Sequence, residues 1–216
     1  MKLLSVNVGL PRELMHEGKM IQSGIFKVPV EGPVRVNALN LAGDRQADLT
    51  VHGGPNKAIY VYPSEHYDFW RKEIPHDEFA WGSFGENLNT EGLLEKHLNI
   101  GDRLCIGSVE LAVSEPRLPC YKLNVKFQRD DMVKRFLKSR RTGFYCAVLR
   151  EGIISAGDAI HYLSRDENRV TVAEITRLYA FDKTDLEAMR RAMEVKALSE
   201  SWRGYFRRRV EKTANS

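Results

Sequence analysis

The segment E-P-R-L-P-C-Y-K at residues 115–122 places a cysteine in a stiff, basic stretch of chain. Its two prolines lack backbone N–H donors and fix φ, which disfavours both a helix interior and a central strand, so we expect a loop. Arg117 and Lys122 favour the thiolate of Cys120, the form that attacks as a nucleophile or binds a metal. A soft thiolate suits a nucleophile, a redox thiol or a soft transition metal. The alternative is a partly buried structural thiol.

The other two cysteines have a different setting. Cys105 and Cys146 fall within alternating strand patterns and are expected in the core. Three cysteines without a C-x-x-C pair argue against a disulfide framework or a zinc knuckle, and cannot hold a four-thiolate iron–sulfur cluster. No histidine forms a local papain-like signature with Cys120. We expect a reducing, cytoplasmic setting.

A second candidate site is the segment G-D-R-Q-A-D-L-T-V-H-G-G-P-N-K, which ends at Lys57. Gly53 and Gly54 allow backbone amides to approach a ligand closely. Arg45, His52 and Lys57 supply donors and positive charge around that backbone, a combination that favours a phosphate or another anion. The segment matches neither a P-loop nor a dinucleotide fingerprint. A turn carrying surface charges is the alternative.

Three weaker signals lie elsewhere. Asn87, in F-G-E-N-L, is either a turn residue or an amide that reads the edge of a heterocycle. Arg141 is part of a basic stretch that suits the end of a helix. Arg207–Arg209 stand beside aromatic residues, but residues 165–216 hold 12 Lys/Arg against nine Asp/Glu. That small surplus favours a solvated helix face over a nucleic-acid interface.

The whole chain has the composition of a globular protein. Its 216 residues are 43% hydrophobic and 29% charged, with a net charge of +4, and this length suits one substantial domain, or one plus a small appendage. No apolar run approaches the ~18 residues of a membrane span, and the N-terminus lacks the features of a signal peptide. We therefore expect neither a membrane nor a nucleic acid as partner.

Residues 1–164 are predicted to be mainly β. Apolar alternation marks strands, and helices are expected at 65–74, 91–97 and 132–138. The expected strands are 3–8, 27–36, 104–113 with a Gly-Ser turn inside, 143–149 and 159–163. Many short strands with few long helices indicate a β-barrel decorated by short helices.

Residues 165–216 are predicted to form a small domain of three helices. Apolar residues recur at helical spacing within 171–180, 185–196 and 199–212. The fold class is thus mainly β with α, with two domains that meet near residue 164.

Several motifs, taken in order, resemble the MOSC domain, a family named for the C-terminal domain of molybdenum cofactor sulfurases. They are D-R-Q-A-D-L-T-V-H-G-G-P-N-K-A-I-Y-V-Y, G-E-N-L, G-D-R-L-C-I-G and E-P-R-L-P-C-Y-K-L. The three-helix segment further resembles the YiiM-type bacterial subfamily. The resemblance implies a MOSC β-barrel that binds the molybdenum cofactor, an anionic pyranopterin with a phosphate.

The resemblance also assigns roles to residues. Cys120 would ligate molybdenum and, with Arg117 beside the metal, would be catalytic. The cofactor-binding residues would be Arg45, His52, Gly53, Gly54, Lys57, Asn87, Arg117, Lys122 and Arg141. Glu115 stands where the family commonly has Gln, which adds negative charge near the metal.

YiiM-type proteins are similar to the mitochondrial amidoxime-reducing components. The implied reaction is reduction of N–OH to N–H in substrates such as 6-N-hydroxylaminopurine. Because the sequence shows no flavin, haem or iron–sulfur motif, electrons would come from a separate flavin or iron–sulfur reductase. The helical segment is a candidate docking element or homodimer interface, and shielding of the barrel is the alternative. The alternative function is a non-catalytic cofactor carrier or a sulfur-transfer protein in cofactor maturation.

Overall fold

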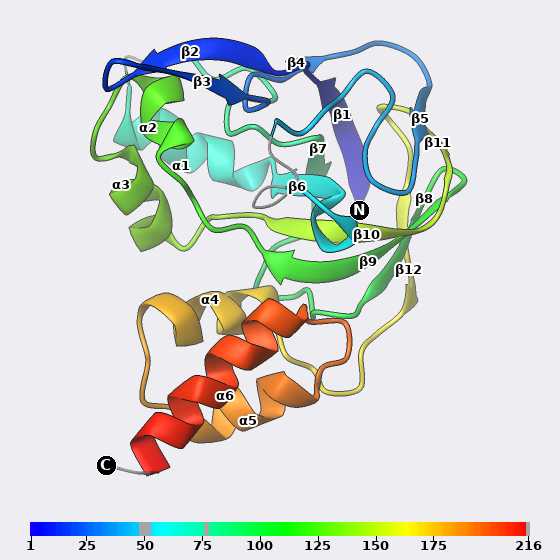
Figure 1. The fold of residues 1–216 in the computed structure, drawn as a ribbon. Helices are drawn as coiled ribbons and strands as arrows, with labels where there is room; N and C mark the ends of the chain where they lie inside the picture. Colours follow the sequence, from blue (N-terminus) through cyan, green and yellow to red (C-terminus); the bar gives the residue numbers. More distant parts are fainter. Residues whose placement is uncertain (48–52, 76–77, 215–216) are drawn as a thin grey trace.

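The computed structural model describes residues 1–47, 53–75 and 78–214. At its centre is an eight-stranded mixed sheet with the strand order β12-β8-β9-β10-β6-β7-β1-β4 (Figure 1). Neighbouring strands are antiparallel except for the parallel pair β6 and β7. The strands of this sheet are β1 (Lys2–Val8), β4 (Val28–Pro29), β6 (Ile59–Pro63), β7 (Leu88–Glu91), β8 (Arg103–Ile106), β9 (Val109–Pro116), β10 (Phe144–Arg150) and β12 (Ile160–Ser164).

The sheet curls until β12, at one end of the strand order, meets β1 near the other end. β4 pairs only with the C-terminal end of β1, which leaves the other end of β1 open on that side. There Leu3 donates its backbone N–H to Asp158 (2.9 Å), and Ile160, at the start of β12, donates to Met1 (3.0 Å). These bonds partly close the sheet into a barrel and satisfy strand edges that would otherwise be exposed.

β9 runs further than the two prolines predict, because it includes Glu115 and Pro116. β8 pairs with β9 only as far as Ala112, whereas β10 pairs with both Glu115 and Pro116. The end of β9 is therefore an edge on one side, where a proline without an N–H is tolerated. The predicted loop begins only at Arg117.

Two smaller antiparallel ribbons and three helices surround the barrel. The ribbons pair β2 (Arg12–His16) with β3 (Lys19–Ser23) and β5 (Val34–Val36) with β11 (Gly152–Ile154). The helices are α1 (Glu65–Glu73), α2 (Lys122–Phe127) and α3 (Met132–Ser139), and a single 3-10 turn, η1, covers Pro55–Lys57. An aromatic cluster with Tyr62, Trp70, Phe84 and Phe136 fills the space between α1, α3 and β6.

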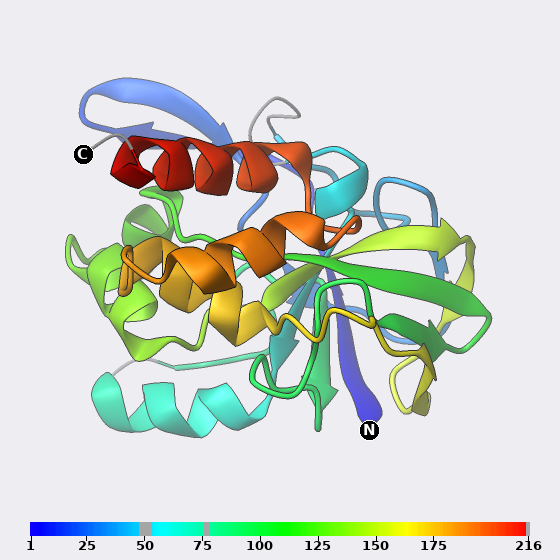
Figure 2. The ribbon, with the colours of Figure 1, turned by 90° about the horizontal axis from the view of Figure 1, so that it is seen from below.

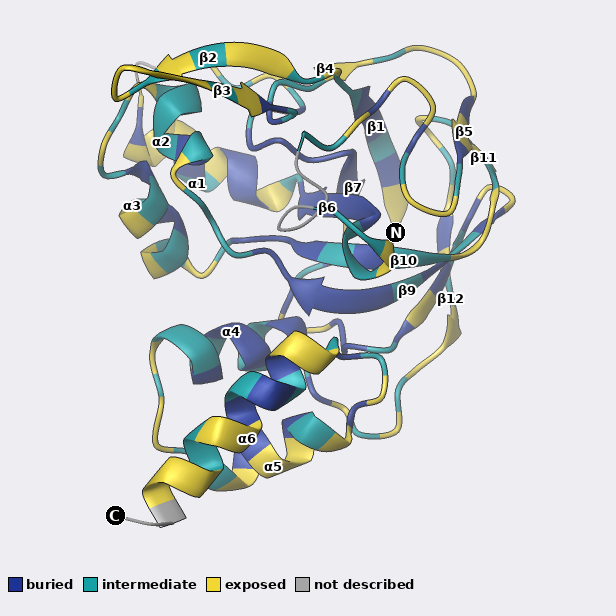
Figure 3. Ribbon diagram, in the orientation of Figure 1, coloured by how far each residue is buried: buried dark blue, intermediate teal, exposed yellow. Residues whose placement is uncertain are grey.

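The C-terminal segment forms the three expected helices, α4 (Val172–Ala180), α5 (Leu186–Glu194) and α6 (Glu200–Ala214). Thr171 and Asp185 cap α4 and α5 with side-chain hydrogen bonds of 3.1 and 3.0 Å. The helices lie together below β9, as Figures 1 and 2 show, and bury the side that faces the sheet (Figure 3). Their apolar residues join those of the barrel in one continuous core.

Two predicted elements are wrong. Residues 91–97 form no helix, because Thr90 is engaged in β7 and Glu95 points inward to accept a hydrogen bond from Gly143 N–H (2.8 Å). The predicted strand at 27–36 is instead β4 and β5, in different sheets. Gly32 between them has φ of 78°, which turns the chain. Mainly β with α, with a curled sheet and a C-terminal helical segment, is nevertheless confirmed as the fold class.

Candidate functional site

The loop between β9 and α2 holds Cys120 at the rim of a cavity. Pro119 precedes Cys120, and the Cys120 carbonyl accepts a hydrogen bond from Leu123 N–H at the start of α2 (2.9 Å). Its side chain is half-buried and its thiol is free. The thiol is therefore held by backbone constraints on both sides and remains accessible.

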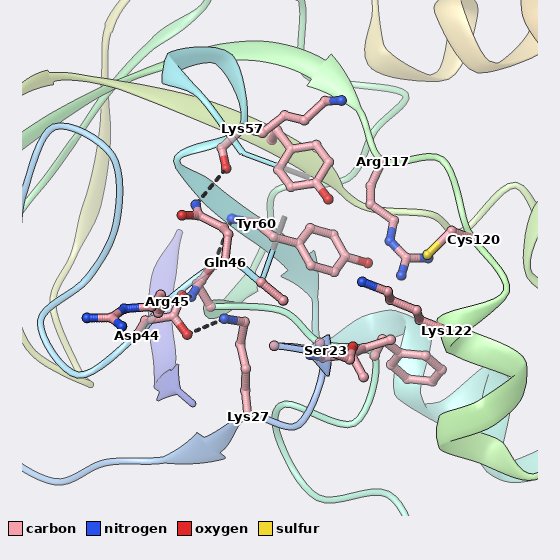
Figure 4. Close-up of a pocket in the computed structure, with 17 residues that line it drawn as sticks. Ser23, Lys27, Asp44, Arg45, Gln46, Lys57, Tyr60, Arg117, Cys120 and Lys122 are labelled. Atoms are coloured by element: carbon pink, nitrogen blue, oxygen red, sulfur yellow. Dashed lines mark hydrogen bonds and ion pairs between the residues drawn. The ribbon is translucent and has the colours of Figure 1, made fainter. Parts of the chain in front are cut away.

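The cavity extends from Cys120 across the barrel to the segment around Asp44 (Figure 4). It contains about 620 Å³ of space between its walls, part of it open to solvent. Five parts of the chain line it: residues 23–27, residues 44–47, residues 57–60, residues 84–87 and the Cys120 loop, with Tyr145 of β10. Segments far apart in sequence thus meet at one hollow.

One wall of the cavity consists of polar groups that are engaged with protein partners. We call it the hydrogen-bonded wall and define it by Lys27, Asp44 and Asn87, which line the cavity, together with Glu86, which is buried behind them. The Asn87 amide donates to Asp44 (2.8 Å) and accepts from Tyr60 N–H (3.1 Å). Asp44 also accepts from Gly9 N–H (3.0 Å) and pairs with Lys27.

Glu86 anchors this wall from behind. It is fully buried and accepts hydrogen bonds from Gly82 N–H (2.9 Å), Phe84 N–H (2.9 Å) and the Asn89 amide (2.8 Å). The hydroxyl of Tyr67 makes a further hydrogen bond to the same carboxylate. A buried carboxylate with this many donors fixes the turn at residues 82–87.

The opposite wall carries groups with unused bonding capacity. We call it the ligand-facing wall and define it by Arg117, Cys120 and Lys122, whose side chains converge on one end of the cavity in Figure 4. Arg117 is only 5% exposed, yet its Nη1 has no hydrogen-bond partner among the described residues. Its guanidinium lies over the rings of Tyr60 and Phe136, with centroids at 5.3 and 5.1 Å. The rings offset part of the cost of burying this charge.

Burial alters the acid–base properties of groups at the cavity. Burial lowers the pKa of Lys27, although Asp44 opposes the shift. Burial also lowers the pKa of Lys126, just behind the cavity, to about 8; its ammonium donates to the carbonyls of Ile25 (2.9 Å) and Gly82 (2.7 Å). Burial raises the pKa of Tyr145, so its hydroxyl stays protonated.

Glu115 lies at the edge of the site, where β9 meets the helical segment. It is buried, and its carboxylate is 3.6 Å from the ammonium of Lys57. Burial raises its pKa, while interactions with Lys57, Ser199 and Trp202 oppose the rise. The carboxylate therefore connects the barrel to the chain around α6.

The structure brings many of the expected site residues to the cavity and leaves others outside it. Lys57, Asn87, Arg117, Cys120 and Lys122 line it. Arg45 also lines it, but its guanidinium points away from Cys120 in Figure 4.

Three of the expected cofactor-binding residues do not line the cavity, and a fourth is not among the described residues. Gly53 and Gly54 are not lining residues; Gly54 has φ of 91° and precedes η1, whose last residue, Lys57, does line the cavity. Arg141 lines a separate hollow between α1 and α3, where its guanidinium is 4.1 Å from the Phe69 ring centroid. His52 lies outside the described residues.

Sequence analysis missed Lys27, Asp44, Tyr60 and Tyr145 as cavity residues. Asp44 and Tyr60 lie within or beside the quoted motifs, so their position was a usable signal. Lys27 and Tyr145 had none, since an isolated lysine and an aromatic strand residue are common on any barrel.

The donor set fits an anionic ligand that carries a soft metal. The Nη1 of Arg117, which has no partner within the described ranges, is a buried donor that an anionic oxygen would satisfy, and Lys122 adds positive charge beside it. The free Cys120 thiol, once deprotonated, is a soft ligand that suits a transition metal. The residues present therefore fit a molybdenum cofactor.

The curled mixed sheet, with this cavity and three C-terminal helices, defines a known class: the chain belongs to the MOSC domain family. Residues 48–161 match the MOSC domain, and residues 170–213 match the YiiM-like, 3-alpha helix domain. The resemblance that the motifs predicted is confirmed.

Particular relatives cover most of the chain. It is 41% identical over 210 residues to the protein YflK of Bacillus subtilis, covering 97% of this chain and 95% of that protein. It is 37% identical over 188 residues to the protein YiiM of Escherichia coli, covering 86% and 83%. A protein named "Reductase" from Gibberella moniliformis is 38% identical over 179 residues, which are 82% of this chain and 32% of that protein.

The fold also matches solved structures. The crystal structure of YiiM from Geobacillus stearothermophilus superposes with a TM-score of 0.82 at 33% identity, covering 97% of this chain and 98% of that one. YiiM from Escherichia coli superposes with a TM-score of 0.78 at 29% identity, covering 99% and 94%. Within the described part of the chain, no helix has the length and apolar character to cross a membrane.

Proposed function

We propose that this protein binds the molybdenum cofactor and reduces N-hydroxylated compounds such as 6-N-hydroxylaminopurine. The single observation that carries the proposal is the ligand-facing wall, where a buried arginine whose Nη1 has no partner among residues 1–47, 53–75 and 78–214 lies beside an accessible thiol. The name of the Gibberella relative, a reductase, supports the same class of reaction. As part of the proposal, the three free cysteines indicate a reducing compartment such as the cytoplasm.

The reaction adds two electrons and two protons to R–NH–OH, breaks the N–O bond, and releases R–NH₂ and water. When bound, the cofactor would supply the two-electron redox chemistry that no side chain performs. Cys120 would hold the metal through its thiolate, while Arg117, Lys122 and Lys57 would bind the negative groups of the ligand. The electrons would come from a separate flavin or iron–sulfur reductase.

The chain's own residues would position the substrate and offer it a hydrogen-bond donor. Tyr145 lines the cavity next to Cys120, and because burial raises its pKa, its hydroxyl can donate a hydrogen bond to substrate or product oxygen. The hydrogen-bonded wall holds the opposite side rigid, which keeps the ligand at a fixed distance from Cys120.

The test is reduction of 6-N-hydroxylaminopurine by protein from a host that makes the cofactor, supplied with a reconstituted flavin and iron–sulfur electron chain. We expect conversion to adenine, which chromatography measures, with one adenine formed for each pair of electrons consumed. Cys120→Ser should abolish turnover, and Cys105→Ser should leave it unchanged. Full turnover by Cys120→Ser would contradict the proposal.

The second candidate is a cofactor carrier or sulfur-transfer protein, which the half-exposed, free Cys120 thiol also suits. It predicts that the protein binds cofactor but turns over no N-hydroxylated substrate with any donor. It further predicts a persulfide on Cys120, a mass increase of one sulfur atom in intact-protein mass spectrometry.

A further inference from the structure

A second hollow adjoins the cavity on its helical side. We call it the helix groove; the end of β9 and the Cys120 loop form one side, and α4 and α6 form the other. It contains about 970 Å³ of space between its walls, part of it open to solvent. Lys57, Cys120 and Tyr145 line both hollows, so the groove leads directly to the thiol.

The helical side of the groove is aromatic. Tyr179 of α4 lies with its ring centroid 5.2 Å from those of both Trp202 and Tyr205 of α6. Trp202 is buried, Tyr179 and Tyr205 are half-buried, and all three contribute to the wall. Leu118 and Pro119 face them from the Cys120 loop. An aromatic wall opposite an apolar loop favours a flat, unsaturated ring.

Polar groups mark the two ends of the groove differently. At the barrel end, the Glu115 carboxylate can accept a hydrogen bond from a ligand N–H or O–H. At the α6 end stands Arg208, an exposed residue that makes no ion pair within the described part of the chain. Its neighbour Arg207, by contrast, pairs with Glu200 (3.3 Å) and does not line the groove. The uncompensated charge of Arg208 favours an anionic substituent on the ligand.

We propose that the helix groove binds the substrate as a nucleotide, with the N-hydroxylated base along the aromatic wall and the phosphate at Arg208. The shared lining at Cys120 then places the hydroxylamino group of the base next to the thiol. The α6 helix thereby supplies the substrate wall of a site whose cofactor residues all come from the barrel. This inference rests on the proposed function and deepens it, since it names the substrate class.

The test is a binding titration that needs no turnover. Isothermal titration calorimetry on the full chain, with and without cofactor, compares 6-N-hydroxylaminopurine with its riboside 5′-monophosphate. We expect the monophosphate to bind about tenfold or more tightly than the base, as one added charge-assisted contact allows. Arg208→Glu should remove that advantage and leave the affinity for the base unchanged.

Two further variants separate a groove effect from a general one. Arg207→Glu makes the same charge change one residue away and should leave both affinities unchanged. Tyr205→Leu should weaken both ligands about tenfold, the scale of a lost base–aromatic contact. Equal affinities for base and monophosphate, or equal effects of Arg207→Glu and Arg208→Glu, would overturn the inference.

The outcomes also separate this inference from the proposed function. If turnover proceeds while the groove variants bind both ligands like wild type, the helix groove is not the substrate site and the reductase proposal stands. If the groove binds the monophosphate as described but the protein takes up no molybdenum, the reductase proposal fails and the groove remains a nucleotide site.

Discussion

The two walls of the cavity use their polar groups in opposite ways. In the hydrogen-bonded wall, Asp44, Glu86 and Asn87 are engaged with protein partners at about normal hydrogen-bond distances. In the ligand-facing wall, Arg117 keeps a buried Nη1 that has no partner in the part of the chain that the structure describes, and Cys120 keeps a free thiol. Asn87 in one wall and Arg117 in the other are both polar and buried, so burial alone does not distinguish a structural residue from a binding one.

The difference shows which wall stabilises the protein and which would bind a ligand. A buried polar group with all its partners specifies the local backbone, whereas one without a partner costs free energy in the empty site. Variants in the hydrogen-bonded wall should therefore lower stability, and variants in the ligand-facing wall should lower binding. Variants in each wall test this contrast.

The largest expected effect is in the hydrogen-bonded wall. Glu86→Ala leaves several buried donors without an acceptor, at about 1–3 kcal/mol each when they cannot relax. We expect the free energy of unfolding to fall by roughly 4 kcal/mol, measured by urea denaturation. The matched control Glu91→Ala removes an exposed carboxylate five residues further along the chain, and should change stability by less than about 0.5 kcal/mol. Equal effects of the two variants would remove the assigned role of Glu86.

The next largest effect is expected in the ligand-facing wall, where a variant should raise stability and lower cofactor binding. Arg117→Met keeps the apolar stem over Tyr60 and Phe136 but removes a buried charge with an unpartnered donor. We expect the empty protein to gain about 1 kcal/mol in unfolding free energy, because the cost of burying the charge is gone. Its retention of cofactor should fall by at least about tenfold, measured as bound molybdenum after gel filtration. A less stable variant with unchanged retention would reverse our view of Arg117.

Glu115 gives a smaller effect that depends on pH. Since burial raises its pKa, the folded state binds this proton more tightly than the unfolded state. The stability due to this group is therefore present at low pH and is lost as the pH rises through the raised pKa. Glu115→Gln should thus be more stable than wild type by about 1 kcal/mol at pH 7.5, with the difference vanishing toward pH 4. Melting curves across this range test it; a Gln variant that is less stable at pH 7.5 would show that pairing with Lys57 outweighs burial.

The smallest effect is expected at Arg141. Its guanidinium stacks on Phe69 and donates to the Ser139 carbonyl (3.0 Å), outside the cavity. Arg141→Met should leave cofactor retention unchanged and lower the unfolding free energy by about 0.5 kcal/mol. It is the control for Arg117→Met, and a loss of cofactor would restore Arg141 to the binding residues.

The fold was largely predictable because its elements carry strong local patterns. The β8–β9 hairpin follows from alternation around a Gly-Ser turn, and the three C-terminal helices follow from apolar residues at helical spacing. The end of β9 was not predictable, because proline is excluded only from strands that are paired on both sides. At Pro116 only β10 is a partner, a fact of long-range pairing that no local sequence contains.

The site was predictable only in part. Residues such as Lys57, Asn87 and Cys120 were brought together by the family resemblance, since their spacing along the chain contains no geometric information. The roles within the cavity needed the structure: Asn87 is engaged in bridging Asp44 to Tyr60, and Arg117 is the buried donor without a partner. The helix groove was also beyond sequence analysis, because it forms only where α6 faces the Cys120 loop.

The most direct test of the account is the molybdenum content of the protein made in a cofactor-competent host, measured by elemental analysis. Wild type, Cys120→Ser and the matched Cys105→Ser are compared after identical purification, with melting curves to show that each is folded. We predict about one molybdenum per chain for wild type and Cys105→Ser, and less than about a tenth of that for Cys120→Ser. Equal molybdenum in Cys120→Ser and wild type would contradict the account.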